Sequence, residues 1–201
     1  MTGGRSFPDL IQRLPRTRAA LAYAEEQHAG QRRTIDGTAF ITHPIEVGLL
    51  LLDAGASDHV IAAGVLHDTI EKAGADSADL RRRFGPRTAA LVAAVTEDEH
   101  IHGYATRKAA LRRQAEAAGR EAMMVFAADK VSKVRELPVG RPGSGAEPVS
   151  RTRKRRLTHY RQCLEMLERH LADSPLVTAL RAELEARAVV SVRRPACADA
   201  V

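Results

Sequence analysis

The sequence predicts an all-α protein that folds as a single helical domain. Apolar residues recur every three or four positions through most of the 201 residues, and no stretch alternates cleanly between apolar and polar residues as a half-buried strand does. Hydrophobic residues make up 44% of the chain and charged residues 28%, which is typical of a globular protein with one sizeable core. Because we find no internal repeat and no linker, we expect one domain over 1–190 and a disordered tail over 191–201.

The expected helices are separated by glycine, proline and polar turns. Gly30 suits a left-handed stop after the first long helix, and Pro44 can occupy the first position of the next one. We expect Asp58 to cap a continuous helix with the sequence "HVIAAGVLHDTIEKAG", and Asp76 or Ser77 to begin a short helix. The expected helices are 16–30, 44–55, 59–74, 77–84, 85–99, 106–119, 120–137, 151–172 and 175–188.

Two segments between these helices are expected to be loops. The first, "QRRTIDGTAFITHP", covers 31–44 and contains the turn signal Asp36-Gly37. The second, "PVGRPGSGAEPVS", covers 138–150 and is rich in glycine, proline and serine, so we expect it to be mobile.

The composition argues against a membrane or secreted protein. The longest apolar run, "VGLLLL", is far shorter than the roughly 20 residues of a membrane span. The N-terminal "MTGGRSFPDL" lacks the apolar centre of a signal peptide. Cys163 and Cys197 lie far apart and form no disulfide framework, which fits a reducing compartment. We therefore expect a cytoplasmic protein.

The net charge of +6 is concentrated in one segment. The run "RTRKRR" at 151–156 supplies five basic residues, which leaves about +1 for the rest of the chain. A positive charge concentrated in one short segment indicates either one anionic partner or a solvated helix face. Aromatic residues make up 3% of the chain, too few for a platform that stacks single-stranded bases, so nucleic-acid binding is not expected.

Four residues with metal-ligand chemistry stand beside apolar segments. His67 and Asp68 follow "VIAAGVL", Asp129 follows "MMVFAA", and His43 ends the first loop. An ionised carboxylate beside so much apolar surface is costly unless a cation or hydrogen bonds compensate it. Two imidazoles and two carboxylates suit Mn²⁺, Fe²⁺ or Zn²⁺ and leave positions for water and substrate.

Each of these residues also has a simpler interpretation. His43 alone could hydrogen-bond its loop, and Asp129 alone could pair with Lys130 or Lys133. Their order along the chain favours a shared site, because buried polar groups need partners and these four would share one.

A loop histidine, a His-Asp pair after an apolar helix and a distant aspartate form the signature of HD-domain phosphohydrolases. The chain resembles the RelA/SpoT family within that group, especially the stand-alone small alarmone hydrolases of the Mesh1 type. The matching segments are "HAGQRRTIDGTAFITHPIEVG", "AAGVLHDTIE", "FGPRTAALVAAVTEDE" and "ADKVSKVREL". They run from about Ala20 to Leu137, with a weaker match from Arg156 to Tyr160.

This resemblance implies a helical HD-domain bundle with one bound Mn²⁺ (manganese) ion. It also implies removal of pyrophosphate from the 3′ position of guanosine tetra- or pentaphosphate. The residues that fall on the family's metal ligands are His43, His67, Asp68 and Asp129.

The resemblance also implies roles around the metal. Arg33 falls near the family's loop arginine on the substrate side, and Arg156 and Tyr160 have the spacing of the residues that face the nucleotide. Glu71 falls on the first acid of the family's "HDxxED". It stands four residues after His67, one helical turn away, where a carboxylate can orient water or take its proton.

Two lysines depart from the family pattern. Lys72 replaces the second acid of "HDxxED", and Lys133 replaces an asparagine. Four residues after Asp68, Lys72 can reach that carboxylate and take the metal's electrostatic place, bind a substrate phosphate, or extend into solvent. Lys133 poses the same choice. We place Lys72 with the catalytic residues and, together with Lys130 and Lys133, with the substrate-binding ones.

Two other functions remain open. The protein could hydrolyse another phosphorylated nucleotide, such as an NADPH-like or adenosine 3′-phosphate compound. It could also be a catalytically silent nucleotide-binding protein whose lysines replace the metal. The sequence leaves the oligomeric state undetermined.

Overall fold

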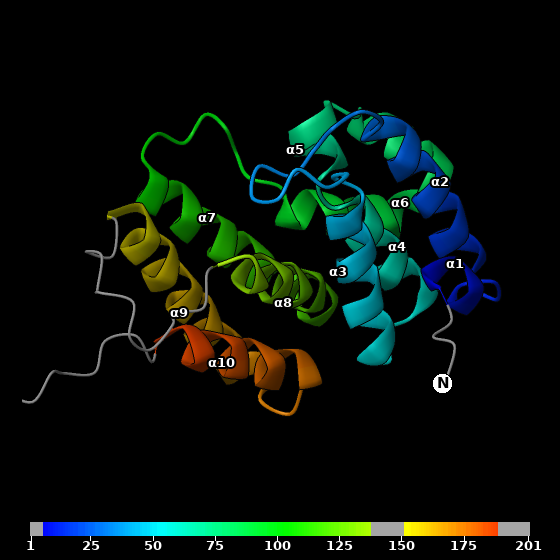
Figure 1. Cartoon of the computed structure of the whole chain (residues 1–201). Coiled ribbons are helices and arrows are strands. Elements are labelled where there is room, and N and C mark those ends of the chain that lie inside the picture. The colour runs from blue at the N-terminus through cyan, green and yellow to red at the C-terminus, as the bar shows by residue number, and fades with distance from the viewer. Residues whose placement is uncertain (1–5, 138–150, 189–201) are drawn as a thin grey trace, which may run out of the picture.

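The computed structural model describes residues 6–137 and 151–188, and these form helices packed around one core (Figure 1). The described residues contain no strand beyond an isolated bridge between Arg32 and Ala39, so the expected all-α fold is confirmed. The helices are α1 (Phe7–Leu10), α2 (Pro15–Gln27), α3 (Thr42–Asp53), α4 (Asp58–Leu66), α5 (Thr69–Ala73), α6 (Ser77–Val95), α7 (Tyr104–Ala117), α8 (Arg120–Arg135), α9 (Arg151–Leu171) and α10 (Pro175–Ala188).

Helix α8 holds the bundle together. It contacts α3, α4 and α6 on one side and α7, α9 and α10 on the other, and Figure 1 shows it between these two groups. Accordingly, α8 is buried along most of its length, including Asp129 and Lys130. Helix α4 is buried at His59 and every later position, as expected of a helix that is apolar all round. The two most enclosed helices therefore precede or carry three of the four predicted metal ligands.

Glycine lets α3 approach α4 closely. A Cβ on Gly64 would lie 2.2 Å from Leu51 Cδ1, and one on Gly48 would lie 3.0 Å from Val65 Cγ2. Any larger side chain at either position would push the helices apart. This close packing brings the start of α3, with His43, beside the end of α4.

The expected continuous helix over 59–74 is wrong. Helix α4 ends at Leu66 and α5 begins at Thr69, with His67 and Asp68 between them. Asp68 has φ −93° and ψ −3°, so the chain leaves the helix without leaving the broad α region. The break is stabilised by the Thr69 hydroxyl, which donates to the carbonyl of Leu66 at 2.7 Å.

Asp58 does not cap its own helix. The residue before α4 is Ser57, and the Asp58 carboxylate instead accepts hydrogen bonds from the backbone N–H groups of Arg16 at 3.1 Å and Thr17 at 2.9 Å. Those groups lie in the first turn of α2, which has no other side-chain cap. The capping chemistry is therefore as expected, but it acts on another helix.

Further boundaries differ by small amounts. The expected helices over 77–84 and 85–99 form one element, α6, which is kinked at Gly85 (φ 85°, ψ 162°). Of the two alternatives for its start, Asp76 is the cap and accepts from the Ala78 N–H. Helix α3 begins at Thr42, so Pro44 occupies its third position, and α1 was not expected. The loop over 138–150 and the tail over 191–201 lie outside the described residues.

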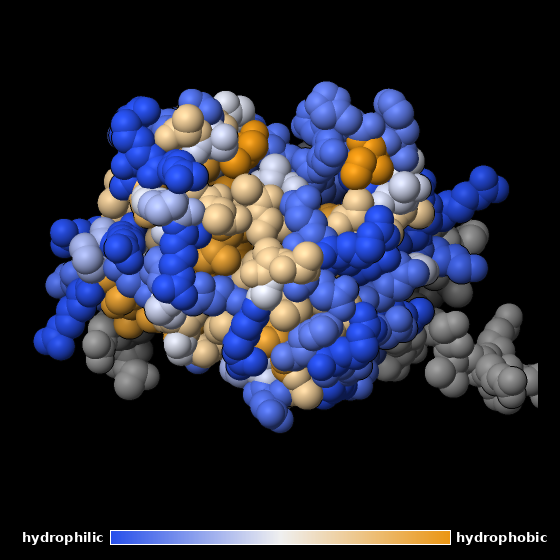
Figure 2. Space-filling view, turned by 180° about the vertical axis from the view of Figure 1, so that it is seen from behind, coloured by the Kyte–Doolittle hydropathy of each residue, from blue (hydrophilic) through white to orange (hydrophobic). Residues whose placement is uncertain are grey.

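The surface is mainly polar. Figure 2 shows a largely hydrophilic face with smaller apolar areas between charged side chains. Among the described residues, Leu10 and Ile35 are the large hydrophobic side chains that are exposed. Within 6–137 and 151–188, no helix combines the length and apolar character needed to span a membrane.

Candidate metal centre and adjoining cleft

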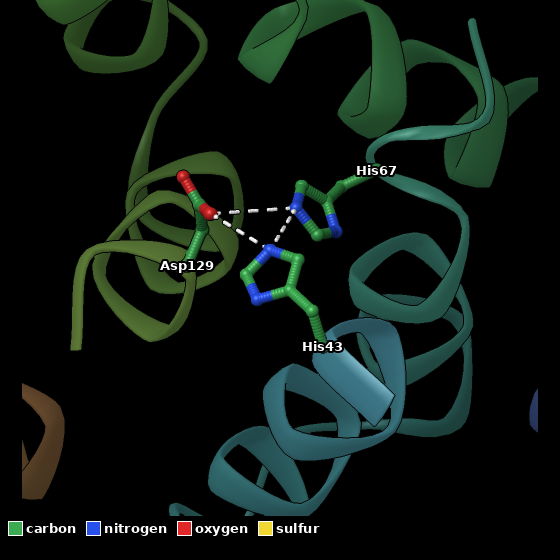
Figure 3. Close-up of side chains that lie close together, drawn as sticks. All are labelled: His43, His67 and Asp129. Carbon is green, nitrogen blue, oxygen red and sulfur yellow. Dashed lines mark hydrogen bonds and ion pairs between the residues drawn. The ribbon is translucent and has the colours of Figure 1, made fainter. Parts of the chain in front are cut away.

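Three buried side chains from three helical segments meet at one point. His43 Nε2 lies 3.2 Å from His67 Nε2 and 3.3 Å from Asp129 Oδ1, and His67 Nε2 lies 3.4 Å from the same oxygen (Figure 3). All three residues are at most 4% exposed. The triangle of two nitrogens and one oxygen is small enough for all three atoms to bind a single ion.

The fourth predicted ligand, Asp68, lies beside this triangle because the helix breaks there. Its Oδ1 lies 3.4 Å from His67 Nε2 and its Oδ2 lies 3.5 Å from His43 Nε2. Consecutive residues of a regular helix point about 100° apart. The break between α4 and α5 lets His67 and Asp68 face the same point.

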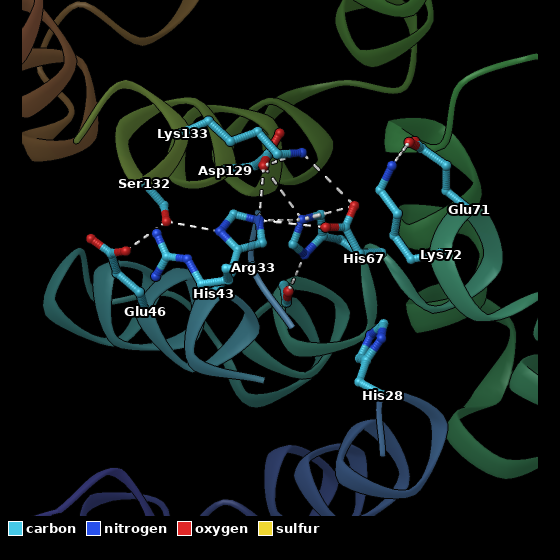
Figure 4. A network of polar contacts seen from close by, with 12 residues as sticks. His28, Arg33, His43, Glu46, His67, Glu71, Lys72, Asp129, Ser132 and Lys133 are labelled. Carbon is cyan, nitrogen blue, oxygen red and sulfur yellow. Dashed lines mark hydrogen bonds and ion pairs between the residues drawn. The ribbon is translucent and has the colours of Figure 1, made fainter. Parts of the chain in front are cut away.

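Hydrogen bonds at the far sides of the rings orient both imidazoles (Figure 4). His67 Nδ1 lies 2.7 Å from the carbonyl of Gly64, to which it can only donate. His43 Nδ1 lies 2.8 Å from Ser132 Oγ, whose proton goes to Glu46 at 2.6 Å, so this ring also donates through Nδ1. Rings so placed direct their Nε2 atoms into the site, as metal-binding histidines do.

These residues fit a divalent cation. Two ring nitrogens face each other across 3.2 Å, and Asp68 Oδ2 is buried without accepting a hydrogen bond from the described residues. Four electron-rich atoms in such a small volume repel one another unless a cation lies among them. Imidazole and carboxylate together suit Zn²⁺, Fe²⁺ or Mn²⁺.

The lysine that reaches this site is Lys133. Its Nζ lies 2.9 Å from Asp129 Oδ1 and 3.8 Å from Asp68 Oδ1, while the buried Lys130 ammonium contacts Asp129 Oδ2. Of the alternatives for Lys72, contact with Asp68 is not the one observed, because the Lys72 ammonium contacts Glu71 Oε1 at 2.7 Å. Helix α8 packs beside the predicted ligands and carries Lys133 to them. The break between α4 and α5 directs the Lys72 side chain toward Glu71 instead.

The electrostatics keep both carboxylates ionised. Burial acts to raise the pKa of Asp68, but the charges of His67 and Lys133 outweigh it and lower that pKa to about 2. The pKa of Asp129 lies well below its usual value because Lys130 and Lys133 outweigh the effect of burial. Burial lowers the pKa of His43 and keeps that ring neutral. Ionised carboxylates and a neutral imidazole are the forms that bind metals.

A cleft of about 690 Å³ opens above the metal ligands. Its lining contains His43, Asp68 and Glu71, and it also contains all six residues predicted to bind substrate. Those six are Arg33, Lys72, Lys130, Lys133, Arg156 and Tyr160. Eight cationic and four acidic side chains line the cleft, so it favours an anionic ligand.

Arg33 is tied to the far wall of the cleft. It donates to Glu136 at 2.9 Å and to Thr42 Oγ1 at 3.3 Å, which joins the first loop to the end of α8. Tyr160 is buried at the other end, and its neighbour Arg156 is partly exposed. The predicted substrate residues therefore lie on opposite sides of one cavity.

A family model for the HD domain matches residues 20–142. The chain belongs to the HD-domain family. It is also 32% identical over 125 residues to the guanosine-3′,5′-bis(diphosphate) 3′-pyrophosphohydrolase MESH1 of Drosophila melanogaster, a match that covers 61% of this chain and 69% of that protein. The predicted RelA/SpoT-type resemblance is confirmed.

Other relatives are much longer proteins. A probable guanosine-3′,5′-bis(diphosphate) 3′-pyrophosphohydrolase of Synechocystis is 41% identical over 78 residues, which is 39% of this chain and 10% of the relative. A GTP pyrophosphokinase of Streptomyces coelicolor is 33% identical over 59% of this chain and 14% of the relative. This HD domain thus matches between a tenth and a seventh of the length of these two relatives.

A solved structure has the same fold. It was described as a metazoan ortholog of SpoT that hydrolyses ppGpp, and it superposes with a TM-score of 0.73 over 87% of this chain and 97% of that one. The sequence identity is 24%, so this likeness concerns the fold.

The cleft of this HD domain also contains residues that the sequence did not single out. Glu97 contacts Lys108 and accepts from Arg107 Nε at 2.8 Å, and Tyr104 lines the same side. Glu97 lies within the matching segment "FGPRTAALVAAVTEDE", which could have indicated it. Nothing in the local pattern of α7 marks Tyr104 or Lys108 as residues of the cleft.

Proposed function

We propose that this HD domain is a metal-dependent hydrolase that removes pyrophosphate from the 3′ position of guanosine tetra- or pentaphosphate. The observation that carries the proposal is the position of two histidines and two aspartates at the base of a cationic cleft. The names of the relatives indicate the nucleotide, because MESH1 and the Synechocystis protein are described as 3′-pyrophosphohydrolases of guanosine bis(diphosphate).

We propose Mn²⁺ as the ion, held by His43, His67, Asp68 and Asp129. A divalent cation in such a site lowers the pKa of water and polarises a phosphate oxygen. The second oxygen of Asp129 is already held by Lys130, which fixes the carboxylate with Oδ1 toward the site.

Glu71 has the position of a general base. It lines the cleft beside the ligands, and Lys72 holds its Oε1, which leaves the other carboxylate oxygen for water. Glu71 takes a proton from the attacking water, and the water oxygen forms a bond to the phosphorus next to the ribose. The bond between that phosphorus and the ribose 3′-oxygen breaks, and the 3′-oxygen takes a proton. The products are pyrophosphate and GDP or GTP.

The cationic residues bind and orient the substrate. Lys72 and Lys133 lie beside Glu71 and Asp129, where an ammonium can contact the 3′-diphosphate. Arg156 and Tyr160 line the other end of the cleft, where they can contact the rest of the nucleotide. A single domain over 1–190 and a cytoplasmic location stay predictions.

Product analysis tests the proposal. Protein purified with manganese is incubated with guanosine tetraphosphate, NADPH and adenosine 3′-phosphate compounds, and the products are separated by ion-exchange chromatography. We expect pyrophosphate and GDP from guanosine tetraphosphate. Release of phosphate from NADPH alone would identify the other hydrolase. Nucleotide binding without any product by metal-loaded protein would identify a silent binding protein.

A further inference from the structure

A second cavity of about 290 Å³ adjoins the cleft on the side away from the metal ligands. It lies between α7 and α9 and shares four lining residues with the cleft. These are Tyr104, Lys108, Arg155 and His159. The two cavities therefore adjoin along these four side chains.

Among the described residues, the second cavity is lined by five cations and no carboxylate. The cations are Lys108, Arg112, Arg151, Lys154 and Arg155. Within the described part of the chain, Lys108 pairs with Glu97, but no carboxylate pairs with the other four. Arg112 donates to the neutral ring of His159 at 3.0 Å, and the Arg155 guanidinium lies over the Tyr104 ring at 4.5 Å.

Several other arginines on these helices and on α8 pair with carboxylates, whereas the exposed Arg113 and Arg161 contact no carboxylate among the described residues. Arg107 pairs with Glu97 at 2.8 Å, Arg135 with Glu46 at 2.9 Å, and Arg169 contacts Glu116 at 3.4 Å. Like charges gathered without a carboxylate repel one another, and an anion bound among them relieves the repulsion. The gathering of these cations around one cavity therefore indicates a binding site for an anion.

His159 shows how positive this wall is. It is 5% exposed, and burial together with the charges of Lys130, Lys108 and Arg112 lowers its pKa to about 2. The ring therefore stays neutral and accepts the hydrogen bond from Arg112, which keeps that guanidinium directed along the wall.

We propose that the second cavity binds a phosphate group at the 5′ end of the nucleotide whose 3′-diphosphate lies at the metal ligands. This inference rests on the proposed function and specifies its substrate as a nucleotide with phosphates at both ends. Guanidinium and ammonium groups recognise phosphate through charge-assisted hydrogen bonds. Because the two cavities adjoin, the proposal assigns the two phosphorylated ends of one nucleotide to neighbouring places.

The test removes charge from the second cavity alone. Arg151 and Lys154 line this cavity but not the cleft, and both are exposed, so Arg151→Gln/Lys154→Gln should fold normally. The control, Arg113→Gln/Arg161→Gln, removes the same charge from exposed positions of α7 and α9 that line neither cavity. Michaelis constants are measured for guanosine tetraphosphate and for an analogue with a 5′-hydroxyl and a 3′-diphosphate.

We expect the cavity variant to raise KM for guanosine tetraphosphate about tenfold, the scale of lost charge-assisted contacts, with kcat unchanged. KM for the 5′-hydroxyl analogue should be the same in all three proteins. Equal KM values for guanosine tetraphosphate in the cavity variant and the control would overturn the proposal.

Two further outcomes separate this proposal from others. Binding of inorganic pyrophosphate is measured by calorimetry in the wild type and both variants. If the cavity variant loses pyrophosphate binding while its KM is unchanged, the ligand is a separate free anion, and the assignment to the nucleotide is overturned. If wild-type protein hydrolyses no 3′-diphosphate at all, the proposed function fails, and pyrophosphate binding still tests whether the cavity takes an anion.

Discussion

At the metal end of the cleft, Lys130 and Lys133 both contact Asp129, whereas in the second cavity Arg112, Arg151, Lys154 and Arg155 contact no carboxylate among the described residues. Both regions are rich in positive charge, so a simple count would not distinguish them. At the metal end, two buried carboxylates lie beside two imidazoles, and Asp68 Oδ2 accepts no hydrogen bond from the described residues. The difference teaches that the presence of carboxylates and imidazoles, rather than the number of cations, indicates the ligand, a cation at one end and an anion at the other.

The largest effect is expected from removing a ligand at the metal end. Wild-type protein should hold about one divalent ion per chain, and His67→Ala should hold close to none and melt at a lower temperature, because an ion bound to the folded state stabilises it. Elemental analysis and thermal melts provide the measurement, with the exposed His100→Ala as control. If His67→Ala kept its full metal content, the metal end of the cleft would not be a cation site, and the comparison with the second cavity would fail.

Glu71→Gln should separate metal binding from chemistry. We expect unchanged metal content and a loss of about 100-fold or more in turnover, the usual scale for a general base. Turnover of guanosine tetraphosphate and elemental analysis are measured on the same preparation, and the exposed Glu99→Gln serves as control. An unchanged rate would mean that another group takes the proton.

Lys133→Met tests whether a lysine competes with the metal. Because the ammonium lies 2.9 Å from Asp129 Oδ1 and its side chain is 29% exposed, its removal should tighten metal binding roughly tenfold, as expected from like-charge repulsion at a partly exposed site. Metal affinity is measured by competition with a chelator. In Lys130→Met the same charge is lost from a buried pair on Oδ2, so we expect a lower melting temperature instead. Unchanged or weaker metal binding in Lys133→Met would show that Lys133 does not oppose the ion.

The smallest effect is expected at Lys72. Its side chain is 44% exposed and contacts Glu71 rather than a metal ligand, so Lys72→Asp should leave metal content unchanged. It should weaken nucleotide binding a few-fold and make KM less dependent on salt, because an exposed charge contributes little and is screened. KM is compared at two salt concentrations with Arg81→Asp as control. Tighter metal binding would instead place Lys72 with the metal.

The sequence predicted which residues gather at the site but not how they are arranged. His67, Asp68 and Asp129 are recognisable because each follows an apolar run that leads into the core. The sequence pattern does not show the break at His67, because apolar residues continue at helical spacing across it. The backbone change is also small, since His67 and Asp68 both keep angles of the α region. Whether Lys72 or Lys133 reaches Asp68 depends on how α8 packs over α4, and this is a property of the tertiary structure.

The same limit explains the other differences. Asp58 has the chemistry of a helix cap, yet its partners are 41 and 42 residues away in α2. The second cavity forms where α7 packs against α9, and the sequence of neither helix alone indicates that contact. The local sequence identifies residues with the chemistry of a cap or a ligand. The packing of the helices determines which groups these residues contact.

The break between α4 and α5 has a consequence for motion. Glu71 and Lys72 lie on α5, a helix of five residues that ends at Gly74 in a left-handed conformation, and so short a helix has little stability of its own. Four of its five residues are at least partly exposed, whereas α4 is buried from His59 onward. Local opening of α5 would therefore expose its amides to hydrogen exchange well before those of α4. We therefore expect the proposed base to lie on a segment that opens more readily than the helix preceding His67 and Asp68.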